Sequence, residues 1–286
     1  MDVFTDFFGI TELNYKARNL VWKHLSLFIG VIIIYNLTSS FLFLYIINTI
    51  GIQEAGVFLA ISIFLSAILD YPSGNLADKI GHKKVLASSY ICFFSFFIGL
   101  VIARTFADFI ILAIIQAVAT SQQSGVLPSW LDSNYRHLAE AEDKEFKIYG
   151  FYKGRLYTMR SVFLPISVMI GGILADLINR QFVFLVTAIS IIVFLIQIIL
   201  LMRSYFPQST SPKSSSLRSL FKNGIIFLGK DRKIFFFFSG SILQDVLWLV
   251  WFSFAMIITF GYVGTDTLLG ITRTIYHISN VIVMLW

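Results

Sequence analysis

The sequence predicts an all-α membrane protein, a bundle of helices that cross the bilayer several times. The chain of 286 residues is 57% hydrophobic and only 13% charged, whereas an ordinary soluble domain carries about 25% charged residues. Its apolar residues also come in long uncharged runs, each near the ~20 residues that a helix needs to cross the hydrocarbon core. A soluble core would instead interrupt such runs at the period of a helix or a strand.

Eight runs give the expected helices in chain order. Backbone groups in lipid must be paired within their own segment, and the sequence lacks the alternating strands of a barrel, so each run is expected to be helical. The first six are Leu25–Ile47, Ala55–Tyr71, Val85–Ala103, Phe109–Leu131, Ser161–Ala175 with a turn added at each end, and Gln181–Met202. The last two, each with one charge inside, are Ile234–Ile258 and Thr267–Trp286.

The basic residues predict the orientation of the bundle. With the N-terminus placed in the cytoplasm, 19 of the 22 Lys and Arg residues fall on the cytoplasmic side, as the positive-inside rule requires. The exceptions are Arg104, Arg180 and, within a span, Arg273. No signal peptide is expected, because the N-terminal segment has no short apolar run before a small-residue cleavage site. We therefore expect a multi-pass protein of the plasma membrane.

A long connection divides the expected helices into two groups. Residues 204–233 begin rich in Ser and Pro, as in a linker, and continue as a basic amphipathic stretch suited to the membrane surface. Residues 1–203 are therefore expected to form an N-terminal six-helix transmembrane bundle. Residues 234–286 are expected to form the first two helices of an incomplete second bundle.

The most specific pattern is a polar segment, DYPSGNLADKIGHKKVL at residues 70–86, between the second and third expected spans. Gly74 and Gly81 permit a tight turn and close helix approach. Asp78 can accept hydrogen bonds or pair with a cation, as a releasable latch does. A simple positive-inside anchor is the alternative, and it explains the lysines but not the spacing of the glycines and the aspartate.

In this position the segment resembles the signature of the major facilitator superfamily, which is a glycine, three residues, an aspartate, a basic residue, any residue, a glycine and a basic run. The matching positions are Gly74, Asp78, Lys79, Gly81, Lys83 and Lys84, with His82 where the family usually has arginine. Two weaker matches follow in register, SGVLPSWLD at residues 124–132 and GGILADLINRQF at residues 171–182.

The resemblance implies a helical bundle of that family's type, with a complete N-terminal six-helix half and two helices of the C-terminal half. It also implies that the loop braces the two halves in the outward-open state and releases on inward opening, with Asp132 as a partner for Lys79. Family members normally have twelve helices, so we expect either a fragment of a longer protein or a degenerate short form.

Ionisable residues inside the expected spans are candidates for solute binding or ion coupling, because each costs about 2.5–3.5 kcal/mol at mid-bilayer. Asp245 and Arg273 lie at similar depth on the seventh and eighth spans, and His277 shares a helix face with Arg273. This placement predicts either a polar cavity wall or a buried structural Asp–Arg pair. His277 alone is more often a packing residue.

Uncharged polar residues on two other spans are further candidates. Asn36 lies near the middle of the first span, and Gln116 and Thr120 share one face of the fourth. In the resembled fold these helices line the central cavity. The alternative is hydrogen bonding between helices, which is common in bundles.

The function that these features favour is secondary active transport of a small solute by alternating access, with proton coupling through Asp245 as a hypothesis. The alternatives are an inactive or truncated transporter remnant and a non-transporting membrane scaffold. Saturable flux with counterflow in vesicles would separate transport from either alternative. The identity of the solute and the direction of transport stay open.

An enzyme is not expected, because the sequence has no nucleophile–base constellation. Four histidines and the single Cys92 leave no credible metal site, and no phosphate-binding Gly-x4-Gly-Lys-Ser/Thr loop is present for ATP. The expected partners are a small-molecule solute and membrane lipids. No cofactor and no nucleic acid are expected, and the protein is expected to be monomeric.

Overall fold

The computed structural model describes residues 3–203, 205 and 232–284. These residues form eleven helices and no strand, which confirms the all-α class. The helices are α1 (Val3–Phe7), α2 (Tyr15–Asn36), α3 (Leu42–Ile50), α4 (Ile52–Ile80), α5 (His82–Ile102), α6 (Phe106–Gln123), α7 (Val126–Leu138), α8 (Lys147–Leu177), α9 (Arg180–Leu201), α11 (Arg232–Val263) and α12 (Asp266–Met284).

Six described segments are long and apolar enough to cross a membrane, in the order that the sequence predicts. They are Tyr15–Asn36, Ile52–Asp70, His82–Ile102, Phe106–Leu138, Lys147–Leu177 and Arg180–Leu201. The seventh expected span falls within α11, and the eighth coincides with α12 as far as Met284, while residues 285–286 lie outside the described residues. Part of the expected linker, residues 206–231, lies outside the described residues, as do the side chains of Asp245 and several neighbours on α11.

The first expected span is interrupted. α2 ends at Asn36, residues 37–41 form turns, and α3 begins at Leu42. Asn36 Nδ2 donates to the Ile32 carbonyl at 2.8 Å, and Ser39 Oγ donates to the Asn36 carbonyl at 2.9 Å. Such local hydrogen bonds compete with continuation of the helix. We call residues 37–41 the span-one break.

The fourth expected span is also divided. α6 ends at Gln123 and α7 begins at Val126, because the intervening Gly125 takes a left-handed φ of 69°, which glycine adopts without a steric penalty. α7 then continues to Leu138, well beyond the expected end of the span.

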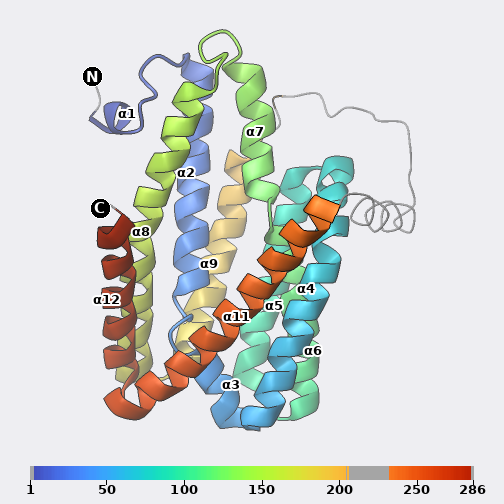
Figure 1. The fold of residues 1–286 in the computed structure, drawn as a ribbon, viewed down its shortest axis with the longest axis vertical. Helices are drawn as coiled ribbons and strands as arrows, with labels where there is room; N and C mark the ends of the chain where they lie inside the picture. The colour runs from blue at the N-terminus through green and yellow to red at the C-terminus, as the bar shows by residue number, and fades with distance from the viewer. Residues whose placement is uncertain (1–2, 204, 206–231, 285–286) are drawn as a thin grey trace.

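The helices α2 to α9 stand side by side, α12 lies along α8, and α11 runs obliquely across the bundle (Figure 1). We call the end where α2 and α8 begin, at Tyr15 and Lys147, the basic end. The opposite end carries short connections, including 178–179 between α8 and α9 and 264–265 between α11 and α12. We call it the short-turn end.

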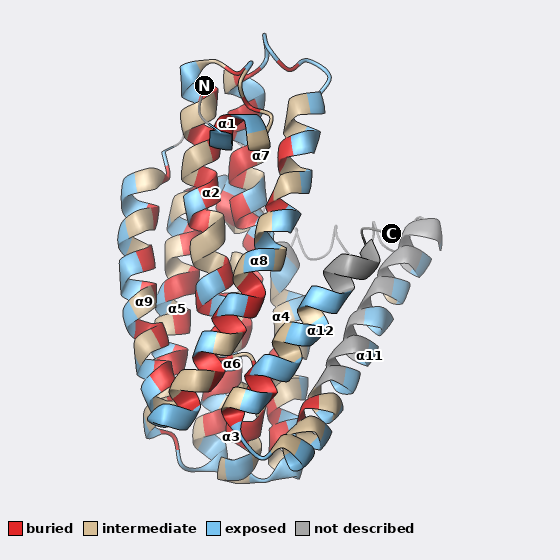
Figure 2. Cartoon of the chain, turned by 90° about the vertical axis from the view of Figure 1, so that its left-hand side faces the viewer, coloured by how far each residue is buried: buried red, intermediate tan, exposed pale blue. Residues whose placement is uncertain are grey.

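Buried residues gather on the helix faces that turn toward one another, and exposed residues lie on the outer faces of the bundle (Figure 2). The core is aromatic: Tyr90, Tyr152 and Phe184 are at most 1% exposed. The outward face of α9 is apolar as well, with exposed residues at helical spacing that include Leu185, Ile189, Ile192, Ile196 and Ile199. A helix that is apolar on every side suits lipid contact rather than water.

Candidate functional site

A cavity of about 270 Å³ lies where the span-one break faces α11 and α12. Aromatic rings form much of its wall, from α2 to α5, and they are Tyr35, Phe43, Phe58, Tyr90, Phe93, Phe96 and Phe97. α11 and α12 close the other side with Ser253, Met256 and Arg273. The cavity is therefore shared between the first six spans and the last two helices.

Hydrogen bonds hold the polar groups of this cavity in place. On α6, Gln116 Oε1 accepts from Ser62 Oγ at 3.0 Å, and Gln123 Nε2 donates to the Tyr90 hydroxyl at 2.7 Å. From α12, the Arg273 guanidinium donates to the carbonyl of Ser39 in the span-one break. The Ser39 carbonyl of the span-one break thus holds the Arg273 guanidinium at the wall of the cavity.

The structure brings together three of the six candidate binding residues. Asn36, Gln116 and Arg273 all line the cavity. Thr120 on α6 and His277 on α12 do not line the cavity. The His277 ring packs against that of Tyr276, with ring centroids 5.5 Å apart. The Asp245 side chain lies outside the described residues, so its pairing with Arg273 stays a prediction.

Two glycines on α8 allow this helix to contact both helix groups. A Cβ built on Gly171 would overlap the Leu37 carbonyl in the span-one break. A Cβ on Gly172 would meet the carbonyl of Asp266 and the Cα of Gly270, both on α12. Without side chains at these positions, α8 packs closely between the break and α12.

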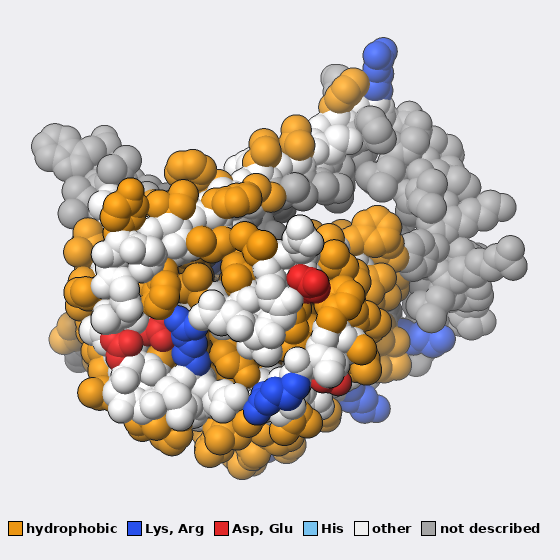
Figure 3. Space-filling view, turned by 90° about the horizontal axis from the view of Figure 1, so that it is seen from below, with side chains coloured by type: hydrophobic (Ala, Val, Ile, Leu, Met, Phe, Trp, Pro, Cys, Tyr) orange, Lys and Arg blue, Asp and Glu red, His pale blue; other side chains and the backbone are white. Residues whose placement is uncertain are grey.

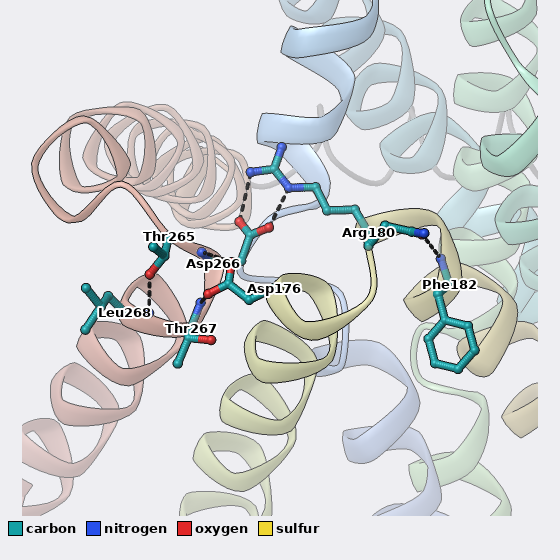
Figure 4. Close-up of polar contacts among 8 residues, drawn as sticks. Asp176, Arg180, Phe182, Thr265, Asp266, Thr267 and Leu268 are labelled. Carbon is teal, nitrogen blue, oxygen red and sulfur yellow. Dashed lines mark hydrogen bonds and ion pairs between the residues drawn. The ribbon is translucent and has the colours of Figure 1, made fainter.

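An ion pair joins the helix groups at the short-turn end (Figure 4). Arg180 Nε and one terminal nitrogen donate to the two carboxylate oxygens of Asp266 at 2.7 and 2.8 Å. The Arg180 and Asp266 side chains are only 15% and 8% exposed, and the guanidinium lies 5.2 Å from the centroid of the Phe260 ring. Such a bidentate arrangement is among the stronger charge-assisted contacts.

A second carboxylate strengthens this connection. Asp176, at the end of α8, accepts hydrogen bonds from the backbone N–H groups of Asp266 and Thr267, both at 2.9 Å. It therefore caps the first turn of α12 from another helix and places a negative charge at its positive end. We call Asp176, Arg180 and Asp266 the short-turn clamp. Viewed from this end, acidic and basic side chains touch within a largely hydrophobic surface (Figure 3).

The family assignment follows from the whole sequence rather than from the cavity alone. Residues 24–286 match the family model described as Major Facilitator Superfamily, a range that includes both helix groups. The chain belongs to the Major Facilitator Superfamily. This MFS chain is thus a multi-pass membrane protein of a transporter family, and the family is not one of enzymes. A comparison with curated proteins finds no match.

The signature loop of this MFS chain lies at the basic end. Gly81 separates α4 from α5 with a φ of 99°, whereas Gly74 lies inside α4 with nothing within 4 Å of an added Cβ. The loop thus needs glycine at position 81 for the turn, but close helix approach does not require it at 74. Asp78 is 75% exposed, and its carboxylate lies 3.9 Å from His82 Nε2.

The expected pair of Asp132 with Lys79 is absent among the described residues, and Lys83, for which no partner was expected, has one. The structure pairs Asp132 with Lys153 of α8, at 3.2 Å, rather than with Lys79, which is exposed at the end of α4. Lys83 Nζ donates to the Ile199 carbonyl in the last turn of α9 at 2.6 Å. In this conformation both contacts remain within the first six spans.

The short-turn clamp was missed by reasoning from the sequence. Asp176 and Arg180 flank a turn, and Asp266 lies about 90 residues later in the sequence, so no local pattern links them. One signal in the sequence could have found it. The connections expected on that side of the membrane carry few charged residues, so two acidic residues and one basic residue beside two short connections were candidates for an ion pair.

Proposed function

We propose that this MFS chain moves a small solute across the plasma membrane by alternating access, with the cavity as the solute site. The observation that carries the proposal is the shared lining of the cavity. Residues of the first six spans form one side, and Ser253, Met256 and Arg273 form the other. A site between two helix groups changes its accessible side when the groups rock against each other. One chain encloses the site, which favours a monomer.

The clamp supports an assignment of the conformation. It fastens the two helix groups at the short-turn end, so separation there first requires a buried ion pair to break. Exposed apolar residues occur along the described length of α11, from Leu243 to Tyr262, so this assignment rests on the clamp alone. With the basic end assigned to the cytoplasm by its lysines and arginines, a clamp at the opposite end corresponds to an inward-facing conformation.

Proton coupling through Asp245 is a further part of the proposal. It rests on the sequence, which places this carboxylate deep in the seventh span, at a depth similar to that of Arg273. Ionisable residues inside spans are costly and commonly mark substrate or proton pathways. Loss of the carboxylate should therefore uncouple transport from the proton gradient.

The test is counterflow in vesicles containing the purified full chain, with radiolabelled organic acids, amines and sugars as a panel. Ser39→Trp fills the cavity, because Ser39 lines it, whereas Ser95→Trp places the same ring on the exposed face of α5 as a matched control. We expect saturable counterflow of at least one solute, abolished by Ser39→Trp and retained in Ser95→Trp. Wild-type vesicles with no saturable counterflow for any solute would favour the scaffold or remnant alternatives.

A further inference from the structure

We propose that the solute is an uncharged planar compound, an aromatic ring that carries neutral hydrogen-bonding groups such as amides or hydroxyls. This inference rests on the proposed transport function and deepens it by naming the chemical class that the cavity fits. In this assignment the aromatic wall contacts the ring of the solute, and three amide side chains bind its polar groups.

The size and wall of the cavity select the ring. About 270 Å³ corresponds to roughly nine water volumes at ~30 Å³ each, enough for a substituted ring but not for a large lipid. Seven aromatic side chains contribute to the lining, together with aliphatic ones such as Ile46 and Leu59. Aromatic rings favour offset or edge-to-face contact with another ring, so a planar ring suits this wall.

Three amides of the lining have an orientation that hydrogen bonds fix. Asn36 Nδ2 donates to a carbonyl of its own helix, and Gln123 Nε2 donates to the Tyr90 hydroxyl. Each of these two amides therefore leaves its carbonyl oxygen as an acceptor for the solute. Gln116 is held the other way round, because its Oε1 accepts from Ser62 Oγ and its Nε2 is left to donate. Among the described residues these three atoms have no other partner, so a group that both donates and accepts fits here.

The positions of the amides indicate more than one polar group on the solute. Gln116 and Gln123 both line the cavity and are seven residues apart on α6, which places them on one face of the helix and about 10 Å apart along its axis. Asn36 reaches the same cavity from the end of α2. The solute therefore meets neutral polar groups at more than one edge of its ring.

A charged head group fits this cavity poorly. Aromatic rings attract cations, but none of the described residues that line the cavity is an Asp or a Glu that could pair with one. An anion would need Arg273, whose guanidinium donates to the Ser39 carbonyl and takes part in a further interaction. We therefore assign Arg273 to holding α12 against the span-one break. A buried charge without a partner is costly, whereas a neutral group needs only the hydrogen bonds that the amides supply.

The experiment measures binding of tritiated isophthalamide, a benzene ring with two carboxamides, to the full chain in nanodiscs. Isophthalate and m-xylylenediamine have the same skeleton and serve as anionic and cationic probes. We expect saturable isophthalamide binding that neither charged probe displaces. Gln116→Leu should weaken this binding about three- to tenfold, because one neutral hydrogen bond is lost. Gln122→Leu, on the same helix but outside the lining, should match the wild type.

If Gln116→Leu fails to fold, Gln123→Leu provides a second reading, because it removes an acceptor from the same face of α6 and should cause a loss of similar size. Absence of isophthalamide binding would overturn the inference. Equal binding of either charged probe, or unchanged isophthalamide affinity in a folded Gln116→Leu or Gln123→Leu protein, would overturn it as well.

Transport is tested separately by counterflow of the same three probes, whose polar or charged groups slow their leak through lipid. Counterflow of a charged probe without isophthalamide would overturn the uncharged class and leave transport standing. Saturable isophthalamide binding without counterflow of any solute would instead overturn the transport proposal.

Discussion

Asp266→Asn should release the short-turn clamp with little change in shape. The substitution keeps the volume of the side chain and one carbonyl acceptor, but it removes the charge that Arg180 contacts at 2.7 and 2.8 Å. A hydrogen bond to a charged group contributes about 1.5–3 kcal/mol. Loss of one such contribution shifts the equilibrium between clamped and released conformations by roughly 10- to 150-fold. Asp176 still caps α12 in this variant, because it bonds backbone N–H groups.

The shift can be measured by side-specific labelling. In a Cys92→Ser background, which removes the single cysteine, Ser253→Cys places a thiol in the cavity lining. A membrane-impermeant maleimide then reports access from either side of oriented vesicles. We expect Asp266→Asn to raise the labelling rate from the short-turn side and to lower it from the basic side.

Asp108→Asn is the matched control. Asp108 is also an aspartate at the short-turn end, but it caps α6 through a capping box with Thr105, within the first six spans. It should leave both labelling rates unchanged. If Asp266→Asn leaves the rate from the short-turn side unaltered, or if Asp108→Asn raises it equally, the clamp does not hold the two helix groups together.

Three further predictions concern packing, the signature loop and coupling. Gly171→Ala should lower the melting temperature, because the added Cβ meets the Leu37 backbone and overpacking costs about 1–3 kcal/mol of stability. Gly154→Ala on the same helix is the control and should not lower it, since nothing lies within 4 Å of the added Cβ. Gly81→Ala should also destabilise the folded protein, by about 1–3 kcal/mol, because its φ of 99° is strained for alanine. Gly74→Ala should leave stability unchanged or raise it, because this residue lies inside a helix with open space around it. Asp245→Asn should abolish the dependence of solute flux on a pH gradient, and unchanged flux and pH dependence would remove this residue from the coupling proposal.

Composition and spacing predict the membrane helices well, because the requirement for ~20 apolar residues is local. The second to sixth spans occur where uncharged runs predict them, whereas the first was expected at Leu25–Ile47 and is found at Tyr15–Asn36. The span-one break was not predicted, since Leu37 and Phe41 continue the apolar run. Hydrogen bonds from Asn36 and Ser39 to the backbone interrupt the helix there, and a hydropathy pattern does not register them.

The candidate cavity was predicted in part. Polar residues inside spans drew attention to Asn36, Gln116 and Arg273, because their burial in lipid needs a reason. The aromatic wall was not predicted, since phenylalanine is abundant throughout the chain, with 30 residues. Which rings face the cavity depends on the rotation of each helix, and packing sets that rotation rather than composition.

The capping of α12 by a carboxylate from another helix ties the folding of a helix end to the movement of the protein. When α8 and α12 separate at the short-turn end, the N–H groups of Asp266 and Thr267 lose the acceptor that Asp176 provides. Water then takes its place, and these two amides exchange their hydrogens with solvent. In the proposed transport cycle, the exchange rate of these amides therefore reports opening at the short-turn end, and a solute that speeds this opening should speed the exchange of two backbone hydrogens.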